Sequence, residues 1–332
     1  MWTAAGCAVQ GLGHSQKEIP CQDKVYQIKN DRGCCAALAD GAGSASLSHI
    51  GADCVVTALS GYLLTHFDEL YHNSDGAEVK KSIIEYILKE LEEKKKQLQC
   101  EIHDLASTCL AVAIQDDRFI LVHLGDGIIG YFSDGEVRVA SYPYNGDYVN
   151  ETVFTTTMNS YAVMDIKKGT TDRVEGFVMM SDGASAGLYE RKSRQLIQPL
   201  LRMGTQLACE SEETGQERIQ RFLERQLRRL TSDDCSLMFV LDQGSLAVLS
   251  HDHKALASIL GLQLTNEREA RRCDFYYELL SFIQLPKTGK QIERKFHIDS
   301  AVVRKRMKRL LDDKLAVRRN GKFVRKYKRD SE

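Results

Sequence analysis

Long apolar runs and proline are both scarce in this sequence. Apolar runs such as 119–124 and 177–180 are far shorter than the roughly 18 residues of a membrane-spanning helix, so no membrane span is expected. Only 4 of 332 residues are proline while 43% are hydrophobic, so the chain can bury a core and is not expected to be disordered. No Lys or Arg precedes the apolar stretch in residues 1–10, which argues against a secretory signal.

Cysteine pairs of the metal-binding kind are also absent. None of the 10 Cys forms a Cys-x-x-Cys pair, and Cys34 and Cys35 are adjacent, which disfavours a zinc site. Several Cys lie inside apolar runs, as buried thiols of a reducing compartment do. We therefore expect a cytoplasmic protein.

Charge is balanced over the whole chain but not along it. The formal net charge is -1, yet residues 271–332 carry 19 basic and 8 acidic side chains, a net of +11, which leaves -12 for the remainder. This asymmetry predicts two bodies with a connector between them. The predicted ranges are an acidic domain at 1–243, a connector at 244–266 and a basic domain at 267–332.

Helical and strand-like periodicities are mixed within residues 1–243. Apolar residues recur at helical spacing in 46–67 and 77–102, and further helices are expected at 189–203 and 215–230. Short strands separated by turn signals run from 107 to 163, and another apolar strand covers 235–241. Adjacent strands with helices grouped before and after them predict an antiparallel α+β sandwich rather than a doubly wound parallel sheet.

The dipeptide Asp-Gly occurs five times, in different contexts. Asp75 opens a predicted helix and Asp134 lies between two strands, so both are interpreted as turns. In an antiparallel sheet the start of one strand lies beside the end of its neighbour, so carboxylates at such positions are expected at one edge. Those that follow an apolar run, or directly precede an apolar strand, are Asp40, Asp126, Asp182 and Asp233-Asp234.

A cluster of Asp without nearby His or Cys favours the hard cations Mg²⁺ and Mn²⁺. Two such ions roughly 3.5–4 Å apart can share a water, lower its pKa and direct it at a phosphorus atom. The glycine that follows Asp40, Asp126 and Asp182 permits close backbone approach. By spacing alone, a metal cluster and a set of unrelated turns are about equally supported.

Six motifs follow one another in a fixed order along nearly all of residues 1–243. They are Cys21-Gln22-Asp23, Ala39-Asp40-Gly41-Ala42-Gly43, Ser107-Thr108, Gly125-Asp126-Gly127, Met180-Ser181-Asp182-Gly183 and Asp233-Asp234-Cys235-Ser236. In order and spacing this set resembles the metal-dependent PPM-type (type 2C) serine/threonine protein phosphatases, and the bacterial members most closely. The resemblance implies a four-layer α-β-β-α sandwich of antiparallel sheets, with metal ions in a cleft at one end.

The resemblance also implies roles for single residues. Asp40 would bridge two ions, the Gly41 carbonyl would bind one of them, and Asp182 and Asp233 would complete the other, so that Asp40 and Asp182 hold the nucleophilic water. Two or three Mg²⁺ or Mn²⁺ ions are expected, with a phosphoprotein substrate made by a Ser/Thr kinase. The implied metal ligands and their outer neighbours are Asp23, Asp40, Gly41, Asp126, Asp182 and Asp233.

The sequence departs from this family at several positions. Ala42 stands where many eukaryotic members have a His as candidate general acid, so slower turnover on alkyl phosphates is expected, and Ser44 replaces a glycine. The Arg that usually grips the substrate phosphate is missing. His14 and Lys17 are the candidate replacements, although a loop histidine without a catalytic part is an equal interpretation of His14. Asp234 replaces the usual Asn, where its extra charge either tightens metal binding or faces solvent.

The basic C-terminal part has the pattern of three helices and a hairpin. Helices are expected at 275–284, at 289–296 with Thr288 as cap, and at 301–313 with Asp299 or Ser300 as cap. A hairpin about Asn320-Gly321 follows, so the order resembles a winged helix-turn-helix. DNA phosphates, a protein partner and the acidic body of the same chain are open alternatives as its ligand. The candidate contacts are Arg304, Lys305, Lys308, Arg309, Arg318, Arg319, Lys322 and Arg325.

The sequence therefore predicts a cytoplasmic, bacterial, metal-dependent protein phosphatase. A hydroxide that bridges the two ions would attack phosphorus directly, and the winged-helix module would localise or regulate the enzyme. The alternative is a weakly active or non-catalytic phosphatase-fold regulator that acts through DNA or protein binding, as Ala42 and the missing Arg suggest.

Overall fold

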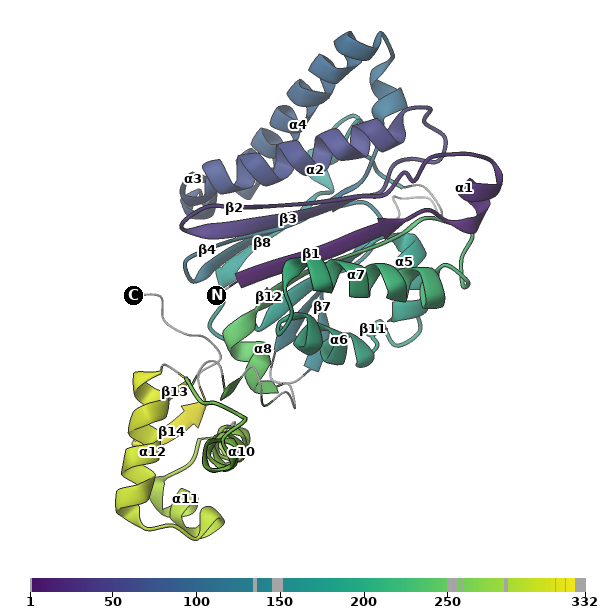
Figure 1. Ribbon diagram of the computed structural model, residues 1–332. Coiled ribbons are helices and arrows are strands. Elements are labelled where there is room, and N and C mark those ends of the chain that lie inside the picture. The colour runs from purple at the N-terminus through teal and green to yellow at the C-terminus, as the bar shows by residue number, and fades with distance from the viewer. Residues whose placement is uncertain are drawn as a thin grey trace.

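Two five-stranded antiparallel sheets form the main body of the computed structural model (Figure 1). The structure describes residues 2–133, 136–144, 152–249, 253, 256–257, 260–283, 286–313, 315–319 and 321–325. The first sheet has the order β1 (Trp2–Val9), β12 (Cys235–Asp242), β9 (Gly176–Met180), β6 (Ile128–Ser133) and β7 (Glu136–Ser141). The second has the order β2 (Lys24–Lys29), β3 (Gly33–Ala39), β4 (Cys109–Gln115), β5 (Arg118–Leu124) and β8 (Asp165–Thr170). The antiparallel α+β prediction is confirmed.

Apolar side chains on both faces of the central strands explain their continuous hydrophobic runs. Every residue of β4 and β12 is buried. One face of these strands contributes to a cluster shared by both sheets, in which Leu110 and Val112 of β4 lie with Phe177 and Met179 of β9. The opposite face packs against helices, which is why these strands do not alternate between apolar and polar residues.

The outer face of the second sheet is covered by α2 (Ser48–Thr65), α3 (Phe67–His72) and α4 (Gly76–Leu98). These helices bury Val55, Leu59, Ile83 and Ile87 against the sheet. The side chain of Asp75 accepts hydrogen bonds from the first turn of α4, so its interpretation as a helix-opening turn is confirmed. The short 3-10 helices η1 (Ile102–Leu105) and η2 (Ser160–Ala162) lie beside α4.

The outer face of the first sheet packs against α5 (Asp182–Leu188), α6 (Pro199–Leu207), α7 (Glu212–Phe222) and the π-helical turn η3 (Leu223–Leu227). The helix predicted at 189–203 is wrong in its first half. A hairpin of β10 (Tyr189–Glu190) and β11 (Gln195–Leu196) stands there, because Arg194 adopts a left-handed φ of 56° that reverses the chain and turns Leu196 into the core.

The C-terminal part has a hydrophobic cluster of its own, which includes Leu279, Ile292, Val303 and Leu310. Side-chain caps at Asn266, Thr288 and Asp299 begin its three helices. Parts of the predicted connector at 244–266, the turn residue Asn320 and the Asp134-Gly135 turn lie outside the described residues. The elements are α8 (Gln243–Leu249), α10 (Glu267–Phe282), α11 (Gly289–Phe296), α12 (Ser300–Asp312), β13 (Ala316–Arg319) and β14 (Lys322–Arg325).

The strand directions give the sandwich two distinct ends. β3, β5 and β9 end, and β4 and β12 begin, at the end near α1 (Leu12–Gln16). The C-terminal helices and hairpin lie beside α8, which follows the other end of β12 (Figure 1). In the described part of the chain, no helix is long and apolar enough to cross a membrane.

Candidate metal centre

Five Asp from distant parts of the chain lie at the end of the sandwich near α1. Each follows a strand of the two sheets or precedes one, as the antiparallel order requires. Asp23 is 1% exposed and the other four are half-buried. The five are Asp23 before β2, Asp40 after β3, Asp126 after β5, Asp182 after β9 and Asp233 before β12.

These carboxylates are close enough to disfavour one another's charge. Burial, followed by the charges of Asp23, Asp182, Asp126 and Asp233, raises the pKa of Asp40 well above its ordinary value. Burial, followed by the charges of Asp126 and Asp233, raises the pKa of Asp182 to about 6. Burial is also the main cause that raises the pKa of Asp23 to about 7, against the opposing effect of the nearby Ser181 and Ser236 hydroxyls. The carboxylates of the cluster therefore repel one another, and a bound cation would reduce this repulsion.

The Ser107-Thr108 motif holds the loop that carries Asp40. The Asp40 N–H donates to the Thr108 hydroxyl at 2.9 Å, and the Thr108 N–H donates to the Asp40 carbonyl at 2.8 Å. Gly41 pairs with Ser107 in an isolated bridge. The Asp40-Gly41 and Ser107-Thr108 motifs thus extend the pairing of β3 with β4 beyond the two strands. This pairing fixes the Asp40 backbone at the site.

Close backbone contacts explain the glycines that follow the aspartates. A Cβ on Gly183 would lie 2.1 Å from the Asp234 carbonyl oxygen, and one on Gly127 would lie 2.7 Å from the Met180 carbonyl oxygen. The Asp182-Gly183 turn is therefore pressed against the Asp233-Asp234 turn. Glycine is needed here for space, because none of these positions has a left-handed φ.

The Asp126 turn is held by the segment that follows β7. The Thr152 hydroxyl donates to the Asp126 carboxylate at 2.6 Å, and the Tyr144 N–H donates to the Gly125 carbonyl at 2.9 Å. Gly125 has a φ of 119°, a conformation that favours glycine. This turn therefore depends on Gly125 as well as on Gly127.

Asp234 has a role that the sequence did not indicate. It is 2% exposed, and its two carboxylate oxygens accept hydrogen bonds of 2.6 Å from the Gly11 and Gln22 N–H groups. The alternative that its charge faces solvent is wrong, because the side chain is buried and both oxygens are turned toward backbone donors. That its charge tightens metal binding stays a prediction. Asp234 joins the segments before α1 and β2 to the start of β12.

His14 also faces Asp234. The imidazole Nδ1 lies 3.0 Å from an Asp234 carboxylate oxygen, and the side chain is 17% exposed. Lys17, at the end of α1, is exposed. The two candidates for phosphate binding thus lie in one short segment, with His14 held in orientation by Asp234.

The donor set of the cluster fits a hard divalent cation. In the part of the chain that the structure describes, no three His, Cys, Asp or Glu side chains form a ready-made metal cage. An oxygen of Asp182 and both oxygens of Asp23 are buried without a well-formed hydrogen bond. Mg²⁺ keeps several waters and uses only one or two carboxylates directly, so half-buried, separated Asp side chains suit it.

Ser185 belongs to a motif that sequence reasoning missed. Residues 183–187 have the Gly-x-Ser-x-Gly spacing of some serine hydrolases. Ser185, however, lies inside α5, is 6% exposed, and its hydroxyl donates to the Asp182 carbonyl at 2.8 Å. Its hydroxyl therefore supports the first turn of α5 and is not presented as a nucleophile.

The basic candidates of the C-terminal part differ in exposure. Arg325 is the exception to the predicted surface: it is 1% exposed and its guanidinium donates to the Ser245 carbonyl at 2.7 Å. Its prediction as a partner contact is wrong, because β14 turns this side chain toward α8. The Arg319 side chain lies outside what the structure describes. Exposed side chains on α12 and on the hairpin are Arg304, Lys305, Lys308, Arg309, Arg318 and Lys322.

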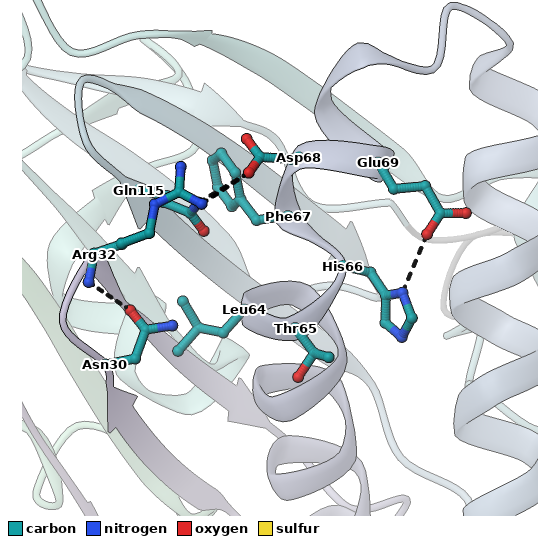
Figure 2. A pocket seen from close by; sticks show the side chains of 9 residues that line it. All are labelled: Asn30, Arg32, Leu64, Thr65, His66, Phe67, Asp68, Glu69 and Gln115. Carbon is teal, nitrogen blue, oxygen red and sulfur yellow. Dashed lines mark hydrogen bonds and ion pairs between the residues drawn. The ribbon is translucent and has the colours of Figure 1, made fainter.

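A cavity of about 470 Å³ lies at the other end of the second sheet (Figure 2). Its lining includes Arg32, which precedes β3, and Gln115, which ends β4. Arg32 forms an ion pair of 2.9 Å with Asp68, so its charge is already balanced. The cavity is separated from the carboxylate cluster by the length of the strands and contributes nothing to it.

Comparisons with known proteins show which family the chain resembles. The family model of protein phosphatase 2C matches residues 10–224. A crystal structure of a bacterial serine phosphatase has a TM-score of 0.51 at 11% identity, and the match covers 73% of this chain and 98% of that one. A point mutant of a bacterial serine phosphatase has a TM-score of 0.52, with the same identity and coverage. The catalytic domain of the serine threonine protein phosphatase PstP, in complex with 2 manganese ions, has a TM-score of 0.47 at 18% identity and covers 73% of this chain and 99% of its own. No curated protein sequence matches the chain.

Proposed function

The chain belongs to the protein phosphatase 2C family and is a protein phosphatase, and we propose that it hydrolyses phosphoserine and phosphothreonine in proteins with two or three Mg²⁺ or Mn²⁺ ions. One observation carries this proposal: five carboxylates from distant segments converge at one end of the sandwich, where burial and the neighbouring charges raise the pKa of Asp23, Asp40 and Asp182. Buried charges of one sign need a partner of the other sign, and a divalent cation is such a partner.

The proposed ligands follow from the position of each side chain. Asp40 has every other carboxylate of the cluster as a neighbour and suits a bridging role, with the Gly41 carbonyl beside it. Asp182 and Asp233 lie on the pressed-together turns and suit a shared ion, while the buried Asp23 and the Thr152-bonded Asp126 suit outer positions. When bound, the ions would lower the pKa of a water and neutralise the phosphoryl oxygens.

The residues around the cluster hold the Asp40 backbone, offer candidate groups for phosphate binding and determine whether the leaving group receives a proton. Ser107 and Thr108 fix the Asp40 backbone, and Asp234 fixes His14 as a candidate for phosphate binding, together with Lys17. Ala42 is 4% exposed and packs with Ala45 and Ala106, so this position supplies no proton to a leaving group. We therefore propose slower turnover on alkyl phosphates than on aryl phosphates, whose leaving groups need less protonation.

Hydrolysis of an aryl phosphate and of a phosphothreonine peptide with Mn²⁺ tests this function. A chelator, Asp40→Ala and Asp182→Ala should each reduce turnover at least about 1,000-fold. Asp75→Ala is the matched control, because Asp75 also precedes a glycine but caps α4. The proposal fails if wild-type protein hydrolyses neither substrate, or if hydrolysis survives removal of the metal.

The remaining structural details support further parts of the proposal. Helices on the outer faces of both sheets support a four-layer α-β-β-α sandwich, and the separate C-terminal cluster supports domains at 1–243 and 267–332 with a connector at 244–266. Three capped helices followed by the β13–β14 hairpin support a winged helix-turn-helix. A bacterial, cytoplasmic enzyme that reverses a Ser/Thr kinase is consistent with these features.

We propose that the C-terminal domain targets or regulates the phosphatase through its exposed basic side chains. Arg304, Lys305 and Lys308 project from α12, and Arg318 and Lys322 from the hairpin. Anisotropy titrations with duplex DNA at two salt concentrations separate DNA from a protein partner, because phosphate contacts weaken steeply as salt rises. If specific DNA binding is found without turnover of any phosphosubstrate, the regulator alternative replaces the enzyme.

A further inference from the structure

A short basic hairpin lies at the rim of the carboxylate cluster. It consists of β10 and β11, which follow α5 and are joined by the turn residues 191–194. β11 lies against β7, whose last residue Ser141 pairs with Ile129 of β6. The neighbouring Ile128 pairs with Met180, two residues before Asp182. The hairpin therefore adjoins the end of the first sheet that carries the cluster.

Arg194 and Tyr142 join this hairpin to the Asp126 turn. The Arg194 guanidinium lies over the Tyr142 ring, 4.2 Å from its centroid, and Tyr142 is 42% exposed. Two residues later, the Tyr144 N–H donates to the carbonyl of Gly125, next to Asp126. Two residues of extended chain span about 7 Å, so the backbone of Tyr142, whose ring contacts Arg194, lies close to the Asp126 turn.

The backbone of Arg194 is in an unusual conformation. Its φ of 56° is left-handed, where a side chain costs energy and glycine or asparagine is favoured. The cation–π contact with Tyr142 holds the charged side chain at this strained position. An arginine at a backbone position that favours glycine indicates that its guanidinium has a function.

The hairpin also carries a net positive charge, because it has three basic side chains and a single acidic one, Glu190. Arg191, Lys192 and Arg194 are exposed. Among the residues that the structure describes, these three take part in no ion pair with an Asp or Glu. A phosphorylated peptide carries negative charge toward a centre that is itself acidic, so cations at the rim favour its approach.

We propose that Arg191, Lys192 and Arg194 bind acidic side chains that flank the phosphorylated residue of the substrate. The inference rests on the proposed phosphatase function and names its substrate class as acidic phosphopeptides. Three or four residues of extended peptide span about 10–13 Å, which bridges the cluster and the hairpin. The guanidinium groups suit this task, because they bind carboxylates through two parallel hydrogen bonds.

The test compares two phosphothreonine peptides of equal length, one with Asp and Glu around the phosphothreonine and one with Ala and Gln. With Mn²⁺, wild-type protein should prefer the acidic peptide in kcat/KM. The triple variant Arg191→Gln/Lys192→Gln/Arg194→Gln should lower that preference about tenfold, mainly through KM, and added salt should lower it in the wild type. Arg194→Gly removes one guanidinium and places at this left-handed position the residue that favours it, so the hairpin backbone is not strained by the change.

Lys89→Gln is the control, because Lys89 is exposed on the remote helix α4. A preference that is unchanged in the triple variant, or an equal loss on both peptides, overturns the proposal. Binding of a phosphonate analogue of the acidic peptide, measured by anisotropy, gives a readout without turnover. If no phosphopeptide is hydrolysed, the proposed function fails. The docking surface is still supported if the wild type binds the acidic phosphonate peptide more tightly than the triple variant does. Equal binding by the two proteins overturns the docking surface.

Discussion

The guanidinium of Arg325, at the end of β14, lies 3.9 Å from the carboxylate of Glu175, which precedes β9. Both side chains are at most 1% exposed. Arg325 also donates to the Ser245 carbonyl, and the Ser245 hydroxyl donates to Asp242 at 2.7 Å. The C-terminal part of the chain is thus joined to the end of the sheet opposite Asp182, which leaves the carboxylate cluster uncovered by it.

Arg325→Met should destabilise the protein strongly. The change leaves the Glu175 carboxylate buried without this cation, which costs about 3–5 kcal/mol when a buried pair is broken. The free energy of unfolding in urea can be followed by the fluorescence of Trp2, which pairs with Asp242 across β1 and β12. Arg304→Met is the control for an exposed arginine, with an expected change below about 0.5 kcal/mol. A loss below about 1 kcal/mol for Arg325→Met would contradict the role of the pair.

Gly183→Ala should abolish phosphatase activity while Gly61→Ala should not. An added Cβ at Gly183 would lie 2.1 Å from the Asp234 carbonyl oxygen, so the Asp182 and Asp233 turns must separate. At Gly61, within α2, a Cβ meets nothing within 4 Å, and alanine should stabilise the helix by about 0.5–1 kcal/mol. Turnover of an aryl phosphate and thermal unfolding of the two variants check this pair. Activity that survives in Gly183→Ala shows that the turns need not touch.

The antiparallel strands and the carboxylates at their ends were accessible from the sequence because both follow from chain-local patterns. The run 109–114 is apolar throughout, and a polar motif stands directly before it at the strand end. Once β3 is paired with β4, the antiparallel direction brings Asp40 beside Thr108. The helix caps at Asp75, Thr288 and Asp299 were predictable for the same reason, since a cap and its helix are neighbours in sequence.

Contacts between distant segments were not accessible in this way. Asp234 binds the Gly11 N–H, 223 residues away, and nothing around Asp234 distinguishes a buried acceptor from a solvated acid. Arg325 was grouped with the exposed basic residues because its neighbours are basic, although contacts with Ser245 and Glu175 bury it. Helical spacing at 189–203 was misleading, since the left-handed turn at Arg194 is set by packing on β7.

Asp234→Asn, which restores the residue usual in the family, should destabilise this chain. Asp234 has two acceptor oxygens, one for the Gly11 N–H and one for the Gln22 N–H, whereas Asn has a single acceptor oxygen. One buried N–H then loses its partner, at a cost of about 1–3 kcal/mol. The free energy of unfolding should fall by this amount, and Asp234→Ala should cost more. An unchanged stability would show that water or a rearranged backbone replaces the lost acceptor.

His123 should make the protein less stable as the pH falls. Its Nδ1 lies 2.7 Å from the Ser141 hydroxyl oxygen, which itself donates to Asp165 at 2.6 Å, so the imidazole donates from Nδ1. Burial lowers its pKa from 6.5 to about 4. Below pH 6.5 the unfolded chain binds a proton that the folded chain does not, so this stabilisation is complete above pH 6.5 and is lost between pH 6.5 and 4, by about 3 kcal/mol in total.

The measurement is the free energy of unfolding in urea at pH 4.5, 5.5, 6.5 and 7.5, for wild type and for His123→Asn. Asparagine places an amide nitrogen near the position of Nδ1 but does not titrate in this range. The cluster of Asp23, Asp40 and Asp182 titrates in both proteins with the opposite sign, because a carboxylate with a raised pKa binds protons more readily in the folded state. The difference between the two curves isolates His123: the stability of the wild type relative to the variant should fall as the pH is lowered. A difference that is constant from pH 7.5 to 4.5 would show that the buried imidazole does not stay neutral.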